Sequence, residues 1–255
     1  VSLTSPNVYW GGEEISCQTA RLANDEMAEG ESKYPDRIRW LASLPFEYPN
    51  KAIIELNRAL ENGAVGIMAT ASINGRHLID PLFEPVWAEI NKHALPVLIH
   101  PTAPFGSKEA EFGIERILMP GAGFMFDTTI GIARMAVDGF FERFQDLKII
   151  ASHGGGYIPY VNGRIDMFFQ VETLNQLKID KLPSEYFSRI YYDAVLYDPG
   201  ALALCIDIAG PEKVLFGTDF PMPCDVPKLY QIIESRPKDE IKAIKGGNAM
   251  KLFGL

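Results

Sequence analysis

The chain has 255 residues, a formal net charge of -9 and a pI near 5.0. Hydrophobic residues make up 47% and charged residues 22% of it, a composition that fits a folded globular protein and excludes a disordered chain. The acidic balance, with no local cluster of Lys or Arg, would repel a phosphate backbone, so nucleic acid is excluded as a partner.

Strand-like and helix-like patterns alternate along the whole chain. Short aliphatic or β-branched runs bounded by Gly or Pro are typical of strands that are covered on both faces. They occur at 1–6, 38–45, 64–70, 96–101, 147–155, 189–195 and 213–219. Between them, apolar residues at intervals of three and four predict helices. These helical patterns cover 17–34, 50–63, 81–95, 129–144 and 198–210.

This alternation predicts an α/β fold with a parallel sheet. About seven such units are one fewer than the eight of a (β/α)₈ TIM barrel, whose catalytic groups stand at the C-terminal ends of the strands. The alternative is an open doubly wound sheet, but no GxGxxG motif follows the first strand. We therefore favour a barrel that is one strand short in this chain. Barrels of roughly 200–250 residues fold as one unit, so we expect a single domain over residues 1–255.

The cysteines and the apolar runs indicate a cytoplasmic protein. Cys17, Cys205 and Cys224 are far apart and lack the CxxC spacing of a structural metal site or a redox pair. We expect them to be reduced thiols, because disulfides are rare in the cytoplasm. The richest apolar run, 201–210, is too short to cross a bilayer and contains Asp207, so no membrane span is expected.

Three predicted strands end on a histidine or a carboxylate directly after an apolar run. These residues are His100 in PVLIHP, His153 in IIASHGGG and Asp219 in LFGTDFP. The strand ends of a barrel share one rim, so the three side chains can converge although they are far apart in sequence. Two imidazoles and a carboxylate suit a divalent ion, with zinc as the first choice and manganese or iron as alternatives.

Each of these residues also has a plain structural interpretation. His100 could be a core histidine bonded to a loop carbonyl, and Asp219 could cap a helix or form an Asx turn. The recurrence of such residues at three strand ends favours a shared site instead. His77 and His93, in a loop and at a helix end, are interpreted as structural.

Two further features follow His153. The triplet 154–156 is all glycine, which either lets a ligand approach the backbone or forms a plain strand-to-helix turn. Arg164 is expected on the helix that leaves this turn. A surface ion pair with Asp166 is the alternative to a functional role for it.

Several motifs occur together in this chain: HP after PVLI, SHGGG followed by PYxxGR, and GTDFP near the C-terminus. With them the chain resembles the amidohydrolase superfamily, in particular the branch that holds aminocarboxymuconate-semialdehyde decarboxylase and γ-resorcylate decarboxylase. The resemblance covers essentially the whole chain. Its motifs are specific for the family and much less so for the substrate.

The resemblance implies a distorted (β/α)₈ barrel with one divalent ion, and a decarboxylase (a carbon–carbon lyase) acting on an aromatic or muconate-like carboxylic acid. His100 and Asp219 would be metal ligands, and Asp219 would also handle the proton of a water molecule. His153 would be the general acid/base beside the metal. Arg164 would reach a substrate carboxylate, in some relatives across a dimer interface, and Phe220 would form a wall of the pocket. A homodimer is therefore expected.

Two other functions remain open. With the same metal the protein would be a hydrolase of a lactone, ester or amide, and without it a non-catalytic relative. The second alternative arises because family members carry an HxH or ExH pair at the end of the first barrel strand, and this sequence has none. A parallel barrel that lacks one strand exposes two unpaired edges, so we expect an N-terminal segment to be absent here. For the same reason, metal binding by residues 1–255 is expected to be weak or nil.

Overall fold

The computed structural model describes residues 1–108, 110–111, 117–171, 177 and 179–255. Six strands form one parallel sheet in the order β1-β2-β5-β6-β7-β8. Their bounds are Leu41–Ser43, Gly66–Thr70, Pro96–His100, Lys148–Ala151, Tyr191–Asp193 and Val214–Leu215. Each strand lies inside a segment that the sequence predicts as a strand, so the predicted α/β class with a parallel, barrel-type sheet is confirmed.

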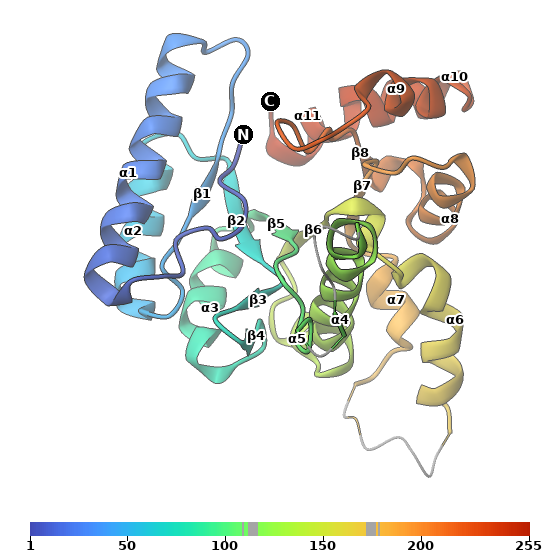
Figure 1. The fold of residues 1–255 in the computed structure, drawn as a ribbon, viewed down its shortest axis with the longest axis horizontal. Helices are drawn as coiled ribbons and strands as arrows, with labels where there is room; N and C mark the ends of the chain where they lie inside the picture. The colour runs from blue at the N-terminus through green and yellow to red at the C-terminus, as the bar shows by residue number, and fades with distance from the viewer. Residues whose placement is uncertain (109, 112–116, 172–176, 178) are drawn as a thin grey trace.

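Helices connect successive strands and cover the outer face of the sheet (Figure 1). The longer ones are α1 Gly12–Lys33, α2 Pro49–Glu61, α3 Glu84–Lys92, α4 Phe124–Val137, α6 Ile158–Phe169, α8 Pro199–Ala209 and α9 Val226–Glu234. The shorter ones are α5 Phe140–Arg143, α7 Pro183–Phe187, α10 Lys238–Lys242 and α11 Asn248–Phe253. Within the described residues, none of these helices is both long and apolar enough to span a membrane.

Local signals explain where several helices begin. Proline stands in the first turn of α2, α8 and α9, where its missing N–H costs nothing. Asp198 and Asp225 precede α8 and α9 and accept hydrogen bonds from backbone N–H groups of the first turn. The aspartate and proline before α9 can also be read from the sequence, although the predicted helices do not include α9. The helices α7, α10 and α11 were also not predicted, because they are too short to carry a periodic pattern.

The predicted strand at 1–6 is wrong in its extent. Val1 does bond alongside β1: its N–H donates to the carbonyl of Arg39 at 2.6 Å, and its carbonyl accepts from Leu41 N at 2.9 Å. The chain then turns away from the sheet, and Asn7 has a φ of 54°, which a strand does not permit. Only the first residue therefore behaves as a strand neighbour.

A short hairpin, β3 Ser72–Ile73 and β4 Arg76–His77, follows β2. Its two turn residues, Asn74 and Gly75, have φ values of 45° and 73°, as a tight two-residue hairpin turn requires. His77 therefore lies on a strand and not in a loop as predicted. The Asn-Gly pair was the signal that would have identified the hairpin.

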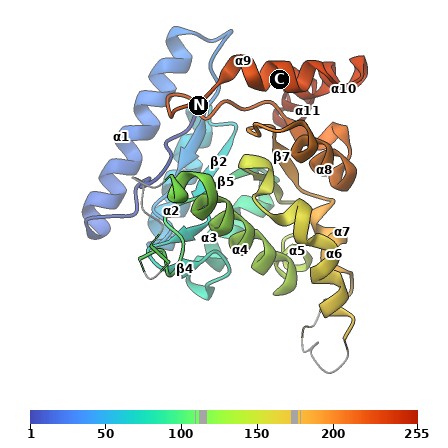
Figure 2. The same ribbon diagram turned by 45° about the vertical axis from the view of Figure 1, so that its right-hand side comes forward.

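The sheet curves around a cavity of about 430 Å³. Side chains from both edge strands line it, with Leu41 on β1 and Leu215 on β8, together with Leu98 and Ile150 from the middle of the sheet. A flat sheet would not bring its two edges to one cavity, so the curvature is that of a barrel wall. Helices lie on the outside of this wall (Figure 2). Their buried apolar side chains form one cluster with those of the strands. The cavity therefore lies where an α/β barrel carries its active site.

Candidate active site

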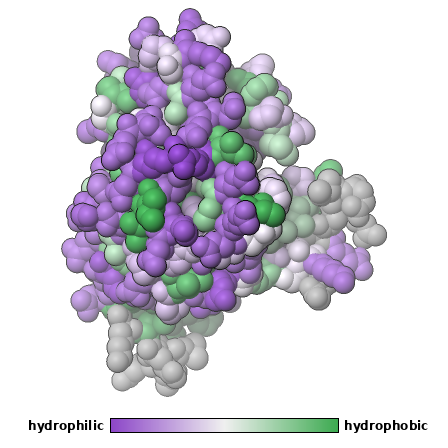
Figure 3. Space-filling model, turned by 90° about the vertical axis from the view of Figure 1, so that its left-hand side faces the viewer, coloured by the Kyte–Doolittle hydropathy of each residue, from purple (hydrophilic) through white to green (hydrophobic). Residues whose placement is uncertain are grey.

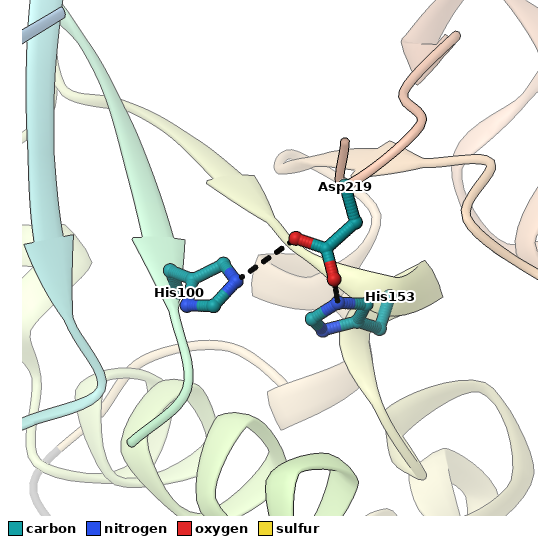
Figure 4. Close-up of side chains that lie close together, drawn as sticks. All are labelled: His100, His153 and Asp219. Atoms are coloured by element: carbon teal, nitrogen blue, oxygen red, sulfur yellow. Dashed lines mark hydrogen bonds and ion pairs between the residues drawn. The ribbon is translucent and has the colours of Figure 1, made fainter. Parts of the chain in front are cut away.

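His100, His153 and Asp219 converge at one point of this cavity, as the sequence predicts (Figure 4). His100 is the last residue of β5, while His153 and Asp219 lie in the segments that follow β6 and β8. Asp219 Oδ1 is 3.4 Å from His100 Nε2, and its Oδ2 is 3.5 Å from His153 Nε2. The two imidazole centroids are 5.3 Å apart.

The backbone is strained at two of these residues. His153 has a φ of 53° and Asp219 a φ of 56°, both in the left-handed region that favours glycine. Each such residue costs on the order of 1–3 kcal/mol, and it persists only where the surroundings hold it in place. Strain of this kind clusters at functional sites, so it supports the assignment of this cavity as the active site.

The glycines that follow His153 are required by packing within the protein. A Cβ on Gly155 would lie 2.6 Å from the ring of Tyr192, and one on Gly156 would lie 2.2 Å from the carbonyl oxygen of Met125. All of 154–156 also have positive φ, which glycine adopts without cost. The triplet is therefore a strand-to-helix turn, and no approach of a ligand is needed to explain it.

Hydrogen bonding orients the His100 ring. Its Nδ1 lies 3.0 Å from the carbonyl oxygen of Pro101, a distance at which it donates, and its Nε2 faces Asp219 Oδ1 at 3.4 Å. This Nε2 is buried and has no aligned hydrogen-bond partner. A histidine that gives one N–H to a carbonyl and turns the other nitrogen to an open site is typical of a metal ligand. His100 and Asp219 therefore fit a divalent ion, with His153 beside it.

The charges of the site influence one another strongly. Burial alone would raise the pKa of Asp219, but the two imidazoles outweigh it and hold that pKa well below its usual range. Burial alone would lower the pKa of His153, but the hydrogen bond with Asp219 and the charges of Asp193 and Asp219 raise it above its ordinary value. The site thus favours a carboxylate next to an imidazole that holds its proton, which suits a general acid.

The two predicted substrate-binding residues differ in position. Phe220 follows Asp219, lines the cavity and is 78% exposed, as a residue at its mouth would be. Arg164 does not line this cavity. It lies exposed on α6, with its guanidinium 4.9 Å from the ring centroid of Phe168. The ion pair considered for it with Asp166 is not found among the described residues.

Two further carboxylates, the buried Asp127 and the half-buried Asp193, lie next to the site and are not among the predicted residues. Asp127 on α4 is 3% exposed and accepts from Thr102 N, two residues after His100, at 2.9 Å. Burial raises its pKa to about 6, against the opposing effects of that bond and of His100. Asp193 ends β7 and lines the cavity. Asp193 satisfies the rule that located Asp219, because it ends an apolar strand, but apolar residues continue after it in the sequence. Asp127, inside a helix, gives no such signal.

Comparisons with known proteins identify the family of this chain. The amidohydrolase family model matches residues 4–255. The chain is 31% identical to the 2-amino-3-carboxymuconate-6-semialdehyde decarboxylase of Dictyostelium discoideum, over 97% of this chain and 69% of that protein. The crystal structure of 5-carboxyvanillate decarboxylase from Sphingomonas paucimobilis superposes with a TM-score of 0.91 at 30% identity, over 100% of this chain and 78% of that one.

A third similar protein was solved with a ligand. It is the dihydroxybenzoic acid decarboxylase from Polaromonas sp., with bound manganese and the inhibitor 2-nitroresorcinol. Its TM-score is 0.88 at 27% identity, over 99% of this chain and 80% of that one. The match of the family model over nearly the full length, together with the strand-end site, leads to one conclusion. The chain belongs to the amidohydrolase family.

Proposed function

We propose that the protein is a metal-dependent decarboxylase that acts on an aromatic or muconate-like carboxylic acid. The observation that carries this proposal is the pairing of His153 with Asp219, opposite His100, in one cavity of about 430 Å³. The similar proteins described above are all named as decarboxylases of small carboxylic acids, which supports the same class here.

His100 and Asp219 would hold one divalent ion. Manganese is supported by its presence in the Polaromonas relative, and zinc remains an alternative that suits the same donors. When bound, the ion would supply positive charge that orients and polarises the substrate. His153 would not be a main ligand of this ion, so it would stay free to transfer a proton.

His153 would give its proton to the substrate carbon that bears the carboxylate. The carbon–carbon bond to the carboxylate then breaks, and its electron pair returns to the substrate and restores the double bond or aromatic ring. The carboxylate leaves as carbon dioxide, and the proton from His153 takes its place. Asp219 stabilises the protonated imidazole before this transfer, since it raises the pKa of His153.

An assay with separate readouts tests this function. The complete gene product, supplied with manganese or zinc, is incubated with 2,6-dihydroxybenzoate, 6-methylsalicylate, 5-carboxyvanillate and a muconate semialdehyde, because residues 1–255 lack the HxH pair of the family. We expect release of carbon dioxide from at least one of them, and no cleavage of matched lactones and esters. Ester or lactone cleavage without carbon dioxide would instead identify a hydrolase. Failure to bind either metal and to turn over any substrate would identify a non-catalytic relative.

We further propose that Arg164 binds the substrate carboxylate of a neighbouring subunit in a homodimer. The support is its position, since it is exposed on α6 and does not line the cavity of its own chain. Its neighbours on this helix include Tyr160, which is 83% exposed, and the half-exposed Phe168. Exposed aromatic residues around an arginine are typical of the core of a protein interface. By contrast, the face on the side of α1 is mainly hydrophilic, with its hydrophobic residues scattered (Figure 3).

Arg164→Ala is expected to lower kcat/KM for the acid substrate by about 10–100-fold, because a charge-assisted bond to the carboxylate is lost. Arg134→Ala is the matched control, since Arg134 is an exposed arginine on α4 next to Asp138.

Mixing Arg164→Ala with His153→Asn subunits then tests the dimer. If Arg164 acts across the interface, a mixed dimer has one site in which both residues are intact, so activity returns. No recovery on mixing would place Arg164 outside a shared site.

A further inference from the structure

We propose that Asp193 is a positioning residue that fixes the His153 imidazole by holding the peptide group that follows it. This inference rests on the proposed role of His153 as a proton donor. The hydrogen bonds that the Asp193 carboxylate accepts come from backbone N–H groups, so it would act on His153 through the backbone.

The sheet places Asp193 between the two strand ends that lead to the site. In the register of the sheet, Tyr192 lies opposite Ala151 of β6, and Asp193 lies opposite Leu215 of β8. The chain reaches His153 two residues after Ala151. The carboxylate of Asp193 therefore stands at the rim between the segments that carry His153 and Asp219, and it lines the same cavity as both.

One oxygen of Asp193 accepts two backbone hydrogen bonds. The bond from Val195 N, at 3.0 Å, closes a local Asx turn at the strand end. The bond from Gly154 N, at 3.1 Å, comes from a residue 39 positions away and contributes nothing to that turn. A strand-end aspartate needs only the first bond. The second ties β7 directly to the residue after His153.

The peptide group between His153 and Gly154 is the one that this hydrogen bond holds in place. His153 has a φ of 53° and Gly154 a φ of 60°, so the chain passes through left-handed backbone on both sides of it. The left-handed conformation is unfavourable for a residue with a Cβ, so His153 tends to leave it unless the following peptide is held. Rotation of that peptide would swing the imidazole away from Asp219, which lies 3.5 Å from its Nε2.

Three variants separate the acceptor from the charge and from the turn. Asp193→Asn keeps an acceptor oxygen and should retain kcat within about threefold at pH values where His153 holds its proton, because the hydrogen-bond geometry survives. Loss of the Asp193 charge should only lower the pH at which kcat falls. Asp193→Ala removes both bonds and should lower kcat by about 10–100-fold with KM little changed, since a displaced catalytic group costs about this much. Asp193→Ser keeps the local turn, but its side chain is one bond shorter and cannot reach Gly154. It should behave like the alanine variant, and it replaces that variant if the latter does not fold.

Asp198→Ala is the matched control. Asp198 also accepts two backbone N–H groups with one oxygen, from Gly200 at 2.8 Å and from Ala201 at 3.0 Å, but it caps α8 and lies outside the cavity. Removing it costs stability at a helix start without touching the site. The kcat of Asp198→Ala is expected to equal that of the unaltered protein. If it does, a lower kcat in Asp193→Ala is not a general result of removing an aspartate that accepts backbone hydrogen bonds.

A second readout does not depend on turnover. The chain has 4 histidines, so the imidazole signals of protein labelled at histidine can be assigned, that of His153 by its loss in His153→Asn. In protein kept free of metal by a chelator, the His153 signal should broaden or split in the Asp193 variants with Ala and Ser. It should stay single and sharp in Asp193→Asn and Asp198→Ala. An unaltered His153 signal in the Ala and Ser variants, or a kcat no lower than that of Asp198→Ala, would overturn the inference. If the signals change as expected but the unaltered protein releases no carbon dioxide, the proposed function fails and the positioning role stands.

Discussion

His153→Asn is expected to lower kcat by about 10²–10⁴-fold, because the substitution removes the group that donates the proton. The metal content should stay nearly unchanged, since His100 and Asp219 are the proposed ligands and the introduced asparagine keeps a side chain of similar size. Turnover by carbon dioxide release and bound metal by elemental analysis are measured on the same samples. The control is His93→Asn, because His93 lies at the end of α3, where its Nε2 is 3.2 Å from Glu89 Oε1, and does not line the cavity.

The pH dependence gives a second check on the same residue. The pKa of His153 is raised above its ordinary value, so its acid form persists to higher pH than that of a free imidazole. If His153 is the acid, kcat falls as pH rises through this raised pKa, and the fall is absent from the residual activity of His153→Asn. Loss of metal in parallel with activity would contradict the role, because it would make His153 a main ligand.

The strand ends explain why the centre of the site could be predicted from the sequence. In a parallel barrel the C-terminal ends of all strands meet at one rim, so a polar residue directly after an apolar run is placed by topology alone. His100, His153 and Asp219 satisfy this rule and lie together. Asp193 satisfies it as well, but apolar residues continue after it in RIYYDAV, so the sequence does not mark it as the end of the strand.

Other features depend on contacts that a sequence does not display. Asp127 lies inside α4. Its place in the helical pattern does not predict that its carboxylate accepts a hydrogen bond from Thr102 N. The glycines 154–156 could be explained only once Tyr192 and Met125 were seen next to them. Arg164 lies on a helix as expected, yet its distance from the cavity is a property of the fold. The sequence therefore predicts what strand topology fixes, and it misses what packing between distant segments decides.

Asp219→Asn is expected to lower metal content and activity together. Mutation of residues that hydrogen-bond to metal ligands typically weakens metal binding by about 10–100-fold. Loss of the charge of a ligand itself should weaken it by more. Asp225→Asn is the control, because Asp225 caps α9 through Lys228 N and lies outside the cavity. A rate and a metal content equal to those of the unaltered protein would remove Asp219 from the site.

The same substitution should also change stability in a pH-dependent way when a chelator keeps the protein free of metal. The pKa of Asp219 lies below its ordinary value of 3.8 in the folded protein, so its stabilising contribution is present above that value and is lost as pH falls through the folded pKa. The pKa of His153 is raised above its ordinary 6.5, so its contribution is present below 6.5 and is lost as pH rises through the raised value. The difference in unfolding free energy between the unaltered protein and Asp219→Asn should therefore be largest between about pH 4 and 6.5, as measured by urea unfolding. A difference that does not vary with pH would mean that the carboxylate and the imidazole are not paired, whatever the effect on turnover.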